Sequence, residues 1–430
     1  MNYKDAIIKE QVKFFSMKKT RLVLTLILLS LSIFYSSAQT IATFSVKIDN
    51  ISNALDVPAS INLDEVTFLS DTSIALFEVQ GKNQIPVPFQ IKQEGHRLMY
   101  WSITPSGKTN FTYVLAKIAP KSFNMISAVN DGSSITITSN EKQLLRYYNT
   151  TVYPPAGIDS VYRRSGFIHP LWTPHGQELT RIQAPDHYHH YGIWNPWTHV
   201  LFEKDTIDFW NLNAKQGTVR FAKMVSKTNG PIFSEFEALH EHVVLKKGAQ
   251  KVALNELQTI RVYQPDKNND YYIVDITSQM NCATESPFLI LEYRYAGMGW
   301  RTTGYWNNTN CEVLTSEGKT RKDTDGTRAK WCIVQGELPG NENGGIAFLS
   351  YPANYNFPEP MRIWTLNTNV RGDMFFSFAP TKDRNWLLEP GKTYVQKYRM
   401  VVFSGKFDAA KAESAWQTYA NPPKVLVTKN

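Results

Sequence analysis

The histidines of this sequence gather in one short stretch. Six of the nine lie between residues 169 and 199, where Asp186 is followed by His-Tyr-His-His. In a strand, His187 and His189 would point to one face and His190 to the other, whereas in a loop all three can converge. Neutral imidazoles beside a carboxylate can ligate a transition metal, or can supply a general acid and base near neutral pH. The alternative is that these rings only hydrogen-bond backbone carbonyls in a proline-rich loop.

A second dense segment, residues 291–301, reads Leu-Glu-Tyr-Arg-Tyr-Ala-Gly-Met-Gly-Trp-Arg. Alternation along a strand would place Glu292 and Arg294 on one surface. The two glycines beside Trp300 and Arg301 suggest backbone that is kept open for a ligand. The plainer interpretation of the Glu and Arg pair is a cross-strand salt bridge.

A third segment contains two motifs that we exclude. The Gly-Lys-Thr sequence at 318–320 suggests a phosphate-binding loop, but the first glycine of that motif would fall on Val313. Asp323 and Asp325 do not form a calcium loop, because no ligand series and no closing Glu follow at the required spacing.

The elements that position these residues are predicted to be strands. Segments that alternate apolar and polar residues indicate half-buried strands, and Asn-Gly or Asp-Gly pairs supply tight turns. The clearest such segments are residues 41–48, 134–139, 271–276 and 394–403. A hairpin tip is expected at residues 325–326, which would return Arg328 and Trp331 to a sheet. One helix is expected over residues 409–419, and an Asn-Pro-Pro sequence ends it.

We therefore predict an all-β fold, in which a small N-terminal β-sandwich precedes a larger antiparallel β-sandwich or supersandwich and a short C-terminal helix. The predicted divisions are a leader and signal peptide at 1–38, the small sandwich at 39–145, the large sandwich with the His-rich site at 146–420, and a tail at 421–430.

The N-terminal segment has the layout of an export signal. Basic residues precede an apolar stretch from Leu22 to Phe34, and Ser-Ser-Ala then stands before Gln39. The apolar stretch is shorter than the ~20 residues that span a bilayer. We expect cleavage before Gln39, a periplasmic or secreted protein, and no transmembrane segment after cleavage.

The composition of the chain limits the classes of molecule that it is expected to bind. The first 38 residues hold six Lys or Arg and two Asp or Glu, so the net charge of +8 falls to +4 without them. Since Lys and Arg form no run beyond short pairs, no nucleic-acid binding is expected. Aromatic residues make up 13% of the chain, and their rings can stack on sugars or fill a sandwich core. The three cysteines permit one disulfide, but spacing leaves its pairing open.

Several of these segments together resemble a bacterial family of unknown function that is often labelled "methane oxygenase PmoA", over roughly residues 150–405. Tyr188 and Tyr191 stand where that pattern has Pro and Arg. The matching residues are His169-Pro170, Thr180-Arg181, Pro185-Asp186-His187, His189-His190, Gly192, Asp208-Phe209-Trp210, Gly318-Lys319-Thr320-Arg321, Asp325-Gly326-Thr327-Arg328 and Trp331-Cys332.

The resemblance implies an exported protein found beside sugar-degrading enzymes, with a sandwich fold of the kind used by sugar epimerases, lyases and hydrolases. The label itself implies copper and an alkane. We do not carry these over, because a particulate methane oxygenase subunit is a multi-helix membrane protein, and no apolar run after residue 38 approaches ~20 residues.

We predict an exported carbohydrate-active enzyme, of hydrolase, lyase or epimerase type, with a carbohydrate as its partner. The alternatives are a non-catalytic sugar-binding module and a protein that holds a divalent metal through His187, His189 and His190. The residues predicted to carry acid/base chemistry in one cleft are His169, Arg181, Asp186, His187, His189, His190, Glu292 and Arg328. Those predicted to bind substrate are Trp194, Trp300, Arg301, Lys319 and Trp331.

Overall fold

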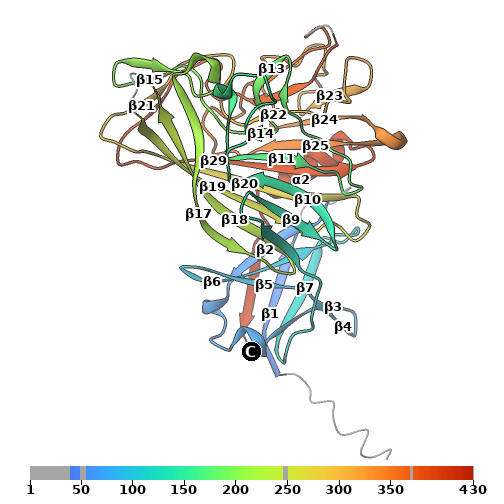
Figure 1. Ribbon diagram of the computed structural model, residues 1–430. Coiled ribbons are helices and arrows are strands. Elements are labelled where there is room, and N and C mark those ends of the chain that lie inside the picture. The colour runs from blue at the N-terminus through green and yellow to red at the C-terminus, as the bar shows by residue number, and fades with distance from the viewer. Residues whose placement is uncertain (1–38, 49–54, 246–249, 369–370, 430) are drawn as a thin grey trace, which may run out of the picture.

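The computed structural model describes residues 39–429 except 49–54, 246–249 and 369–370 (Figure 1). The predicted leader and signal peptide lie outside the described residues. Strands make up 52% of the described residues and helices 7%, so the all-β prediction is confirmed. Figure 1 shows a larger lobe above and a smaller lobe below it. Within the described ranges, no helix is both long enough and apolar enough to cross a membrane.

The smaller lobe is a sandwich of two antiparallel sheets around one apolar core. Trp101 lies at the centre of this core, with its ring 5.9 Å from that of Phe44 and 5.6 Å from that of Tyr113. The first sheet has the order β30 (Val425–Lys429), β1 (Gln39–Lys47), β7 (Asn110–Lys117), β3 (Ala75–Gln80) and β4 (Asn83–Val87). The second has the order β2 (Val57–Asn62), β6 (His96–Ile103) and β5 (Gln90–Glu94).

The C-terminal residues return to this smaller lobe. β30 pairs antiparallel with β1, from Ala42 opposite Lys429 to Val46 opposite Val425. The segment 421–430, expected as a tail, therefore contains a strand. The pairing covers one edge of β1, which would otherwise present unpaired backbone groups.

The boundary between the two lobes lies earlier in the chain than the predicted residue 145. The strands β8 (Ile126–Asn130), β9 (Ser134–Ser139) and β10 (Lys142–Tyr148) belong to a sheet of the larger lobe. Their apolar side chains, such as Ile137 and Leu145, share a core with Ile260 and Phe348. The Asp-Gly turn at 131–132 thus connects two strands of one sheet, and the lobes separate between β7 and β8.

The larger lobe is built from two eight-stranded antiparallel sheets that enclose the main core. The first has the order β26 (Met361–Ile363), β27 (Phe375–Phe378), β22 (Gly299–Arg301), β14 (Ile193–Trp194), β11 (Phe167–Leu171), β10, β9 and β8. The second has the order β17 (Gly217–Thr228), β18 (Phe233–Val244), β19 (Lys251–Tyr263), β20 (Tyr271–Cys282), β29 (Tyr394–Ser404), β25 (Glu342–Ser350), β24 (Trp331–Leu338) and β23 (Cys311–Thr315).

Three smaller elements complete this lobe. A two-stranded hairpin consists of β12 (Ile182–Ala184) and β13 (His187–Tyr191). A four-stranded sheet has the order β16 (Asp205–Ile207), β15 (Val200–Phe202), β21 (Phe288–Ile290) and β28 (Trp386–Leu388). The helix α2 (Ala409–Ala420) begins after Asp408, whose side chain accepts a hydrogen bond from the backbone N–H of Lys411, as the sequence predicts.

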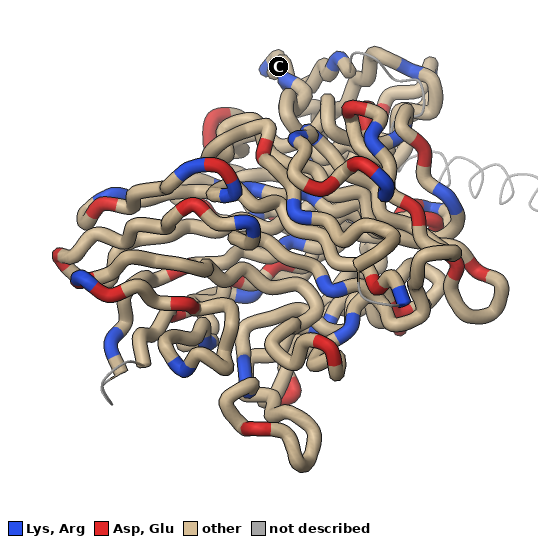
Figure 2. Tube along the Cα trace, turned by 90° about the horizontal axis from the view of Figure 1, so that it is seen from above, with Lys and Arg blue, Asp and Glu red and all other residues tan. Residues whose placement is uncertain are grey.

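Period-two alternation gives each large sheet an inner and an outer face. On the second sheet, Phe236 and Ile260 point into the core, and Glu235 and Arg261 point outward toward the smaller lobe. On the first sheet, Trp300 points inward and its neighbour Arg301 points outward. The two outer faces therefore look in opposite directions across the sandwich. Figure 2 shows Lys and Arg interspersed with Asp and Glu along the trace.

The three cysteines are free thiols, with Cys311 and Cys332 buried and Cys282 half-buried. Burial raises the pKa of the Cys311 thiol to about 12. The disulfide that the sequence permits is thus not formed in this structure.

One buried acid makes the stability of the fold depend on pH. The carboxyl group of Glu359 is fully buried and accepts hydrogen bonds from Ser350 (2.6 Å), Asn354 (2.9 Å) and Tyr398 (2.8 Å). Burial outweighs these hydrogen bonds and raises the pKa of Glu359 to about 7. A raised acid pKa stabilises the fold below the unfolded-state pKa, and this contribution is lost as pH rises through the folded-state pKa.

We therefore predict that Glu359→Gln lessens the loss of stability between pH 5 and pH 8. A shift of this size corresponds to at most about 3 kcal/mol in the free energy of unfolding. Denaturant unfolding at both pH values checks this, with exposed Glu285→Gln as the matched control. An equal difference between wild type and Glu359→Gln at both pH values contradicts the prediction.

Candidate functional site

The hairpin β12–β13 lies over the outer face of the first sheet and gathers the three clustered histidines. Its pairs, Ala184 with His187 and Ile182 with Tyr191, leave one residue of β12 opposite three of β13. Such a bulge breaks the simple alternation of side chains. As a result, the three rings contact one another, which is expected of a loop but not of a regular strand. The ring centroids of His187, His189 and His190 lie 4.7 to 5.3 Å apart.

His189 and His190 are neutral groups, and His190 is packed among aromatic rings. His190 is 1% exposed, and its ring lies 5.2 Å from those of Trp194 and Phe375. Burial lowers the pKa of His190 well below its usual value. Burial, reinforced by neighbouring positive charge, lowers the pKa of His189 to about 3. Both rings are therefore uncharged at neutral pH.

Asp186 joins His187 to a buried arginine. The Nδ1 atom of His187 lies 2.9 Å from Asp186 Oδ2, and Nη2 of Arg301 donates to both Asp186 oxygens at 2.7 and 2.9 Å. Although burial opposes it, these hydrogen bonds hold the pKa of Asp186 well below its usual range. A carboxylate can only accept a hydrogen bond, so His187 Nδ1 must donate its proton to the bond with Asp186. This leaves Nε2 as the basic nitrogen of the neutral ring. The side chain of His187 is 29% exposed.

Arg301 is held in an apolar setting. Its side chain is fully buried, and its guanidinium carbon lies 4.6 Å from the ring centroid of Trp364. Burial lowers the pKa of Arg301 to about 10, so the group remains charged at neutral pH. Two of its nitrogens, Nε and Nη1, are buried without a hydrogen-bond partner from the protein.

Positive charge exceeds negative charge around this cluster. Arg181 donates to Asp373 at 2.9 Å, and Arg371 binds the same carboxylate. Together with Asp186 and Arg301, this makes three guanidinium groups for two carboxylates. Nε of Arg181 is also buried without a partner from the protein. The unpartnered arginine nitrogens are all donors, which suits an anionic or oxygen-rich ligand.

His169 lies beside this cluster but belongs to a separate hydrogen-bonded group. Its Nδ1 atom lies 2.9 Å from Thr180 Oγ1, and burial lowers the pKa of the ring to about 4. Gly192 stands close to it, since a Cβ added there would come 3.1 Å from the His169 Cβ and 2.1 Å from the Ile168 carbonyl oxygen. In the described part of the chain, no ring contact joins His169 to the other three histidines.

The prediction that Glu292 and Arg328 lie with the histidine cluster is wrong. Residues 291–296 are not a strand, so the alternation expected for Glu292 does not apply, and its exposed side chain lies on a connection after β21. Arg328 instead fixes the loop at 356–358, where it donates to the carbonyls of Asn356 and Pro358 and pairs with Asp383.

The tryptophans expected to stack on a sugar are part of the core. Trp194, Trp300 and Trp331 are at most 3% exposed. Lys319 pairs with Asp323 at 3.2 Å in the turn after β23, away from the histidines. Of the five predicted substrate-binding residues, only Arg301 brings a charged group to the histidine cluster. Sequence reasoning missed Trp364, Arg371 and Asp373, which no local motif distinguishes.

The metal hypothesis is not supported by the arrangement of the histidines. The rings of His187 and His190 stack on each other, the ring of His189 meets both edge to face, and His187 Nδ1 is used by Asp186. Across the described residues, no group of three or more His, Cys, Asp or Glu side chains is placed to hold a metal ion.

Two tyrosines of β13, Tyr188 and Tyr191, stabilise the hairpin. The ring of Tyr188 lies 5.6 Å from that of Tyr162, and the Tyr191 hydroxyl donates to the Tyr162 carbonyl.

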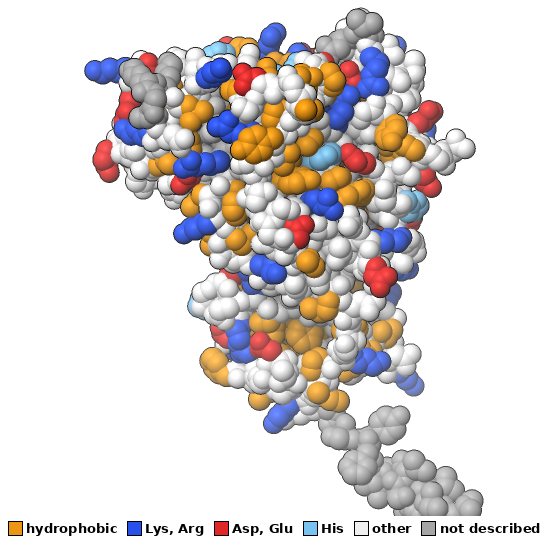
Figure 3. Space-filling model, viewed as in Figure 1, with side chains coloured by type: hydrophobic (Ala, Val, Ile, Leu, Met, Phe, Trp, Pro, Cys, Tyr) orange, Lys and Arg blue, Asp and Glu red, His pale blue; other side chains and the backbone are white. Residues whose placement is uncertain are grey.

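Figure 3 shows hydrophobic side chains gathered over the larger lobe, with imidazole and charged side chains among them.

The comparisons with known proteins assign the chain to a family but to no function. No curated protein matches the chain. One family model matches residues 134–417, which hold all of β10 to β29 and most of α2, and therefore the whole His cluster. The chain thus belongs to a family of unknown function, DUF6807.

Proposed function

We propose that this protein is an exported carbohydrate-active enzyme in which Asp186 and His187 transfer a proton. The observation that carries the proposal is the chain of contacts from buried Arg301 through Asp186 to partly exposed His187. A carboxylate that orients an imidazole and stabilises its protonated form is a recurrent arrangement in general acid–base catalysis. The N-terminal export signal predicted from the sequence supports the exported location.

The neutral histidines beneath His187 would assist without taking the proton. When Nε2 of His187 accepts a proton, the ring becomes cationic, and Asp186 at 2.9 Å offsets that charge. His189 and His190 remain neutral because burial keeps their pKa values low. They would therefore not repel the protonated ring, and their packing restricts its rotation.

The surplus of arginine supports a substrate that carries an acid group, such as a uronic acid. A carboxylate makes the proton on the adjacent carbon removable, and guanidinium groups stabilise the negative charge that develops when that proton leaves. His187 would abstract this proton. An epimer forms when a proton from water reaches the opposite face of the carbon and His187 releases the proton it took to solvent. An unsaturated sugar forms when the oxygen substituent on the next carbon leaves and takes up the proton held by His187. Among the predicted types, the lyase and epimerase reactions fit this chemistry best.

We predict that His187→Ala and Asp186→Asn each lower turnover by at least about 100-fold, which is the usual contribution of a positioned acid or base. The compounds used in this assay are oligomers of galacturonic, glucuronic, mannuronic and guluronic acid. Elimination is followed by the ultraviolet absorbance of the new double bond, and epimerisation by uptake of deuterium from the solvent. His175→Ala, an exposed histidine that contacts Glu342, is the matched control and should keep full activity. Absence of turnover on every glycan by the wild type, or full activity in His187→Ala, contradicts the proposal.

We predict a different outcome for His190→Ala. Because this ring is buried among Trp194, Trp364 and Phe375, its removal leaves a cavity and should lower the free energy of unfolding by about 2–4 kcal/mol. His187→Ala, at a partly exposed ring, should cost less than about 1 kcal/mol. Denaturant unfolding of both variants separates the structural histidine from the proposed base. Equal losses of stability in the two variants would overturn this division of roles.

A further inference from the structure

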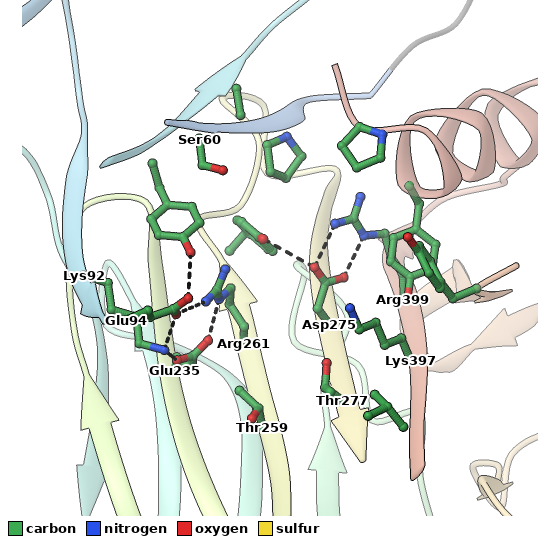
Figure 4. Close-up of a pocket in the computed structure, with 18 of the residues that line it drawn as sticks. Ser60, Lys92, Glu94, Glu235, Thr259, Arg261, Asp275, Thr277, Lys397 and Arg399 are labelled. Atoms are coloured by element: carbon green, nitrogen blue, oxygen red, sulfur yellow. Dashed lines mark hydrogen bonds and ion pairs between the residues drawn. The ribbon is translucent and has the colours of Figure 1, made fainter. Parts of the chain in front are cut away.

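A cavity of about 650 Å³ lies between the two lobes, on the opposite side of the sandwich from the histidine cluster (Figure 4). Its floor is the outer face of the second sheet, formed by β18, β19, β20 and β29. Its walls come from β2 and β5 of the smaller lobe and from the end of α2. Cavities of this size hold small ligands in many proteins.

The lobes are held together beside this cavity by apolar packing. Tyr100 of the smaller lobe packs against Phe233, with ring centroids 5.2 Å apart, and both join Tyr263 and Ile273 in one cluster. Tyr100 and Tyr263 also line the cavity, so this packing holds part of its wall in place. A site with fixed walls loses little conformational entropy when a ligand binds.

The charges that line the cavity balance one another. Four cationic and four anionic side chains are present, so the lining has no net charge. Arg261 binds Glu235 at 2.5 Å and Glu94 at 3.3 Å. Arg399 binds Asp275 at 2.7 and 2.8 Å. Because most of these groups already satisfy each other, the lining offers little attraction to a free ion.

Two charged groups have no ion-pair partner and face polar neighbours. The Lys397 amino group lies 5.3 Å from the ring centroid of Tyr351, and in the described residues no carboxylate is within ion-pair distance of it. Figure 4 shows it directed toward Asp275 and Thr277. Among the described residues, Glu237 accepts hydrogen bonds only from the hydroxyl groups of Ser226 (2.7 Å) and Thr259 (3.4 Å). The cavity thus presents both donors and acceptors.

We propose that this inter-lobe cavity binds a neutral oligosaccharide. Hydroxyl groups of a sugar both donate and accept, which matches a lining of lysine, glutamate and threonine side chains without net charge. Tyr100, Tyr263, Tyr351 and Tyr419 add ring surface of the kind that packs on sugars. The site is separate from the histidine cluster because the two lie on oppositely directed faces of the sandwich.

Isothermal titration with maltohexaose, cellohexaose, xylohexaose and mannohexaose tests the proposal, with hexagalacturonate as the acidic comparison. At least one neutral probe should bind the wild type, and about 1 M salt should change its affinity less than twofold because the ligand is uncharged. Lys397→Ala should weaken that binding at least about tenfold, as expected for loss of hydrogen bonds from a charged group. Thr277→Trp, which fills the cavity, should abolish it.

Two controls locate the binding. Lys392→Ala removes an exposed lysine that pairs with Glu389 outside the cavity, and it should leave affinity unchanged. His187→Ala should also bind normally, so this test does not depend on the proposed catalytic role. Melting temperatures of all variants show whether each is folded. The proposal is overturned if no neutral probe binds, if binding survives both Lys397→Ala and Thr277→Trp in folded protein, or if His187→Ala abolishes it.

Discussion

The candidate site depends on neutralising one buried guanidinium. Arg301 points outward from β22 yet is fully buried, because Trp364 and the hairpin β12–β13 cover it. A buried charge without a partner costs several kcal/mol. Asp186, in the turn between β12 and β13, supplies that partner and is thereby fixed in place. The same carboxylate then accepts a hydrogen bond from His187, so the constraint that stabilises the hairpin also orients the ring nearest to solvent.

The sandwich gives the protein two chemically different outer faces. The first carries a surplus of arginine, two carboxylates and neutral imidazoles. The second carries ion pairs that cancel, and it is partly covered by the smaller lobe and α2. β30 joins the end of the chain to β1, so both the first and the last described strands belong to the smaller lobe. The proposed acidic-sugar chemistry and the proposed neutral-sugar binding therefore use separate faces of the larger sandwich.

Sequence patterns predict what is local and fail where the structure depends on distant contacts. Period-two alternation identifies the strands, and Asp408 with the Asn-Pro-Pro sequence marks the ends of α2. The clustering of histidines locates the hairpin, because its residues are adjacent in the chain. The partners of Asp186 and Arg181 lie 115 and 192 residues away, and no local signal announces Asp373 or Trp364. Burial also cannot be predicted from residue type alone: Trp194, Trp300 and Trp331 fill cores, and Arg328 fixes a loop.

The orientation of His187 by Asp186 is the central claim, and nitrogen-15 NMR of the imidazole rings tests it most directly. Long-range proton–nitrogen correlations distinguish the two neutral forms of a histidine ring. The account predicts that neutral His187 carries its proton on Nδ1 in the wild type and becomes a mixture of both forms in Asp186→Asn. A neutral His187 protonated on Nε2 in the wild type, or an unchanged form in the variant, would contradict it.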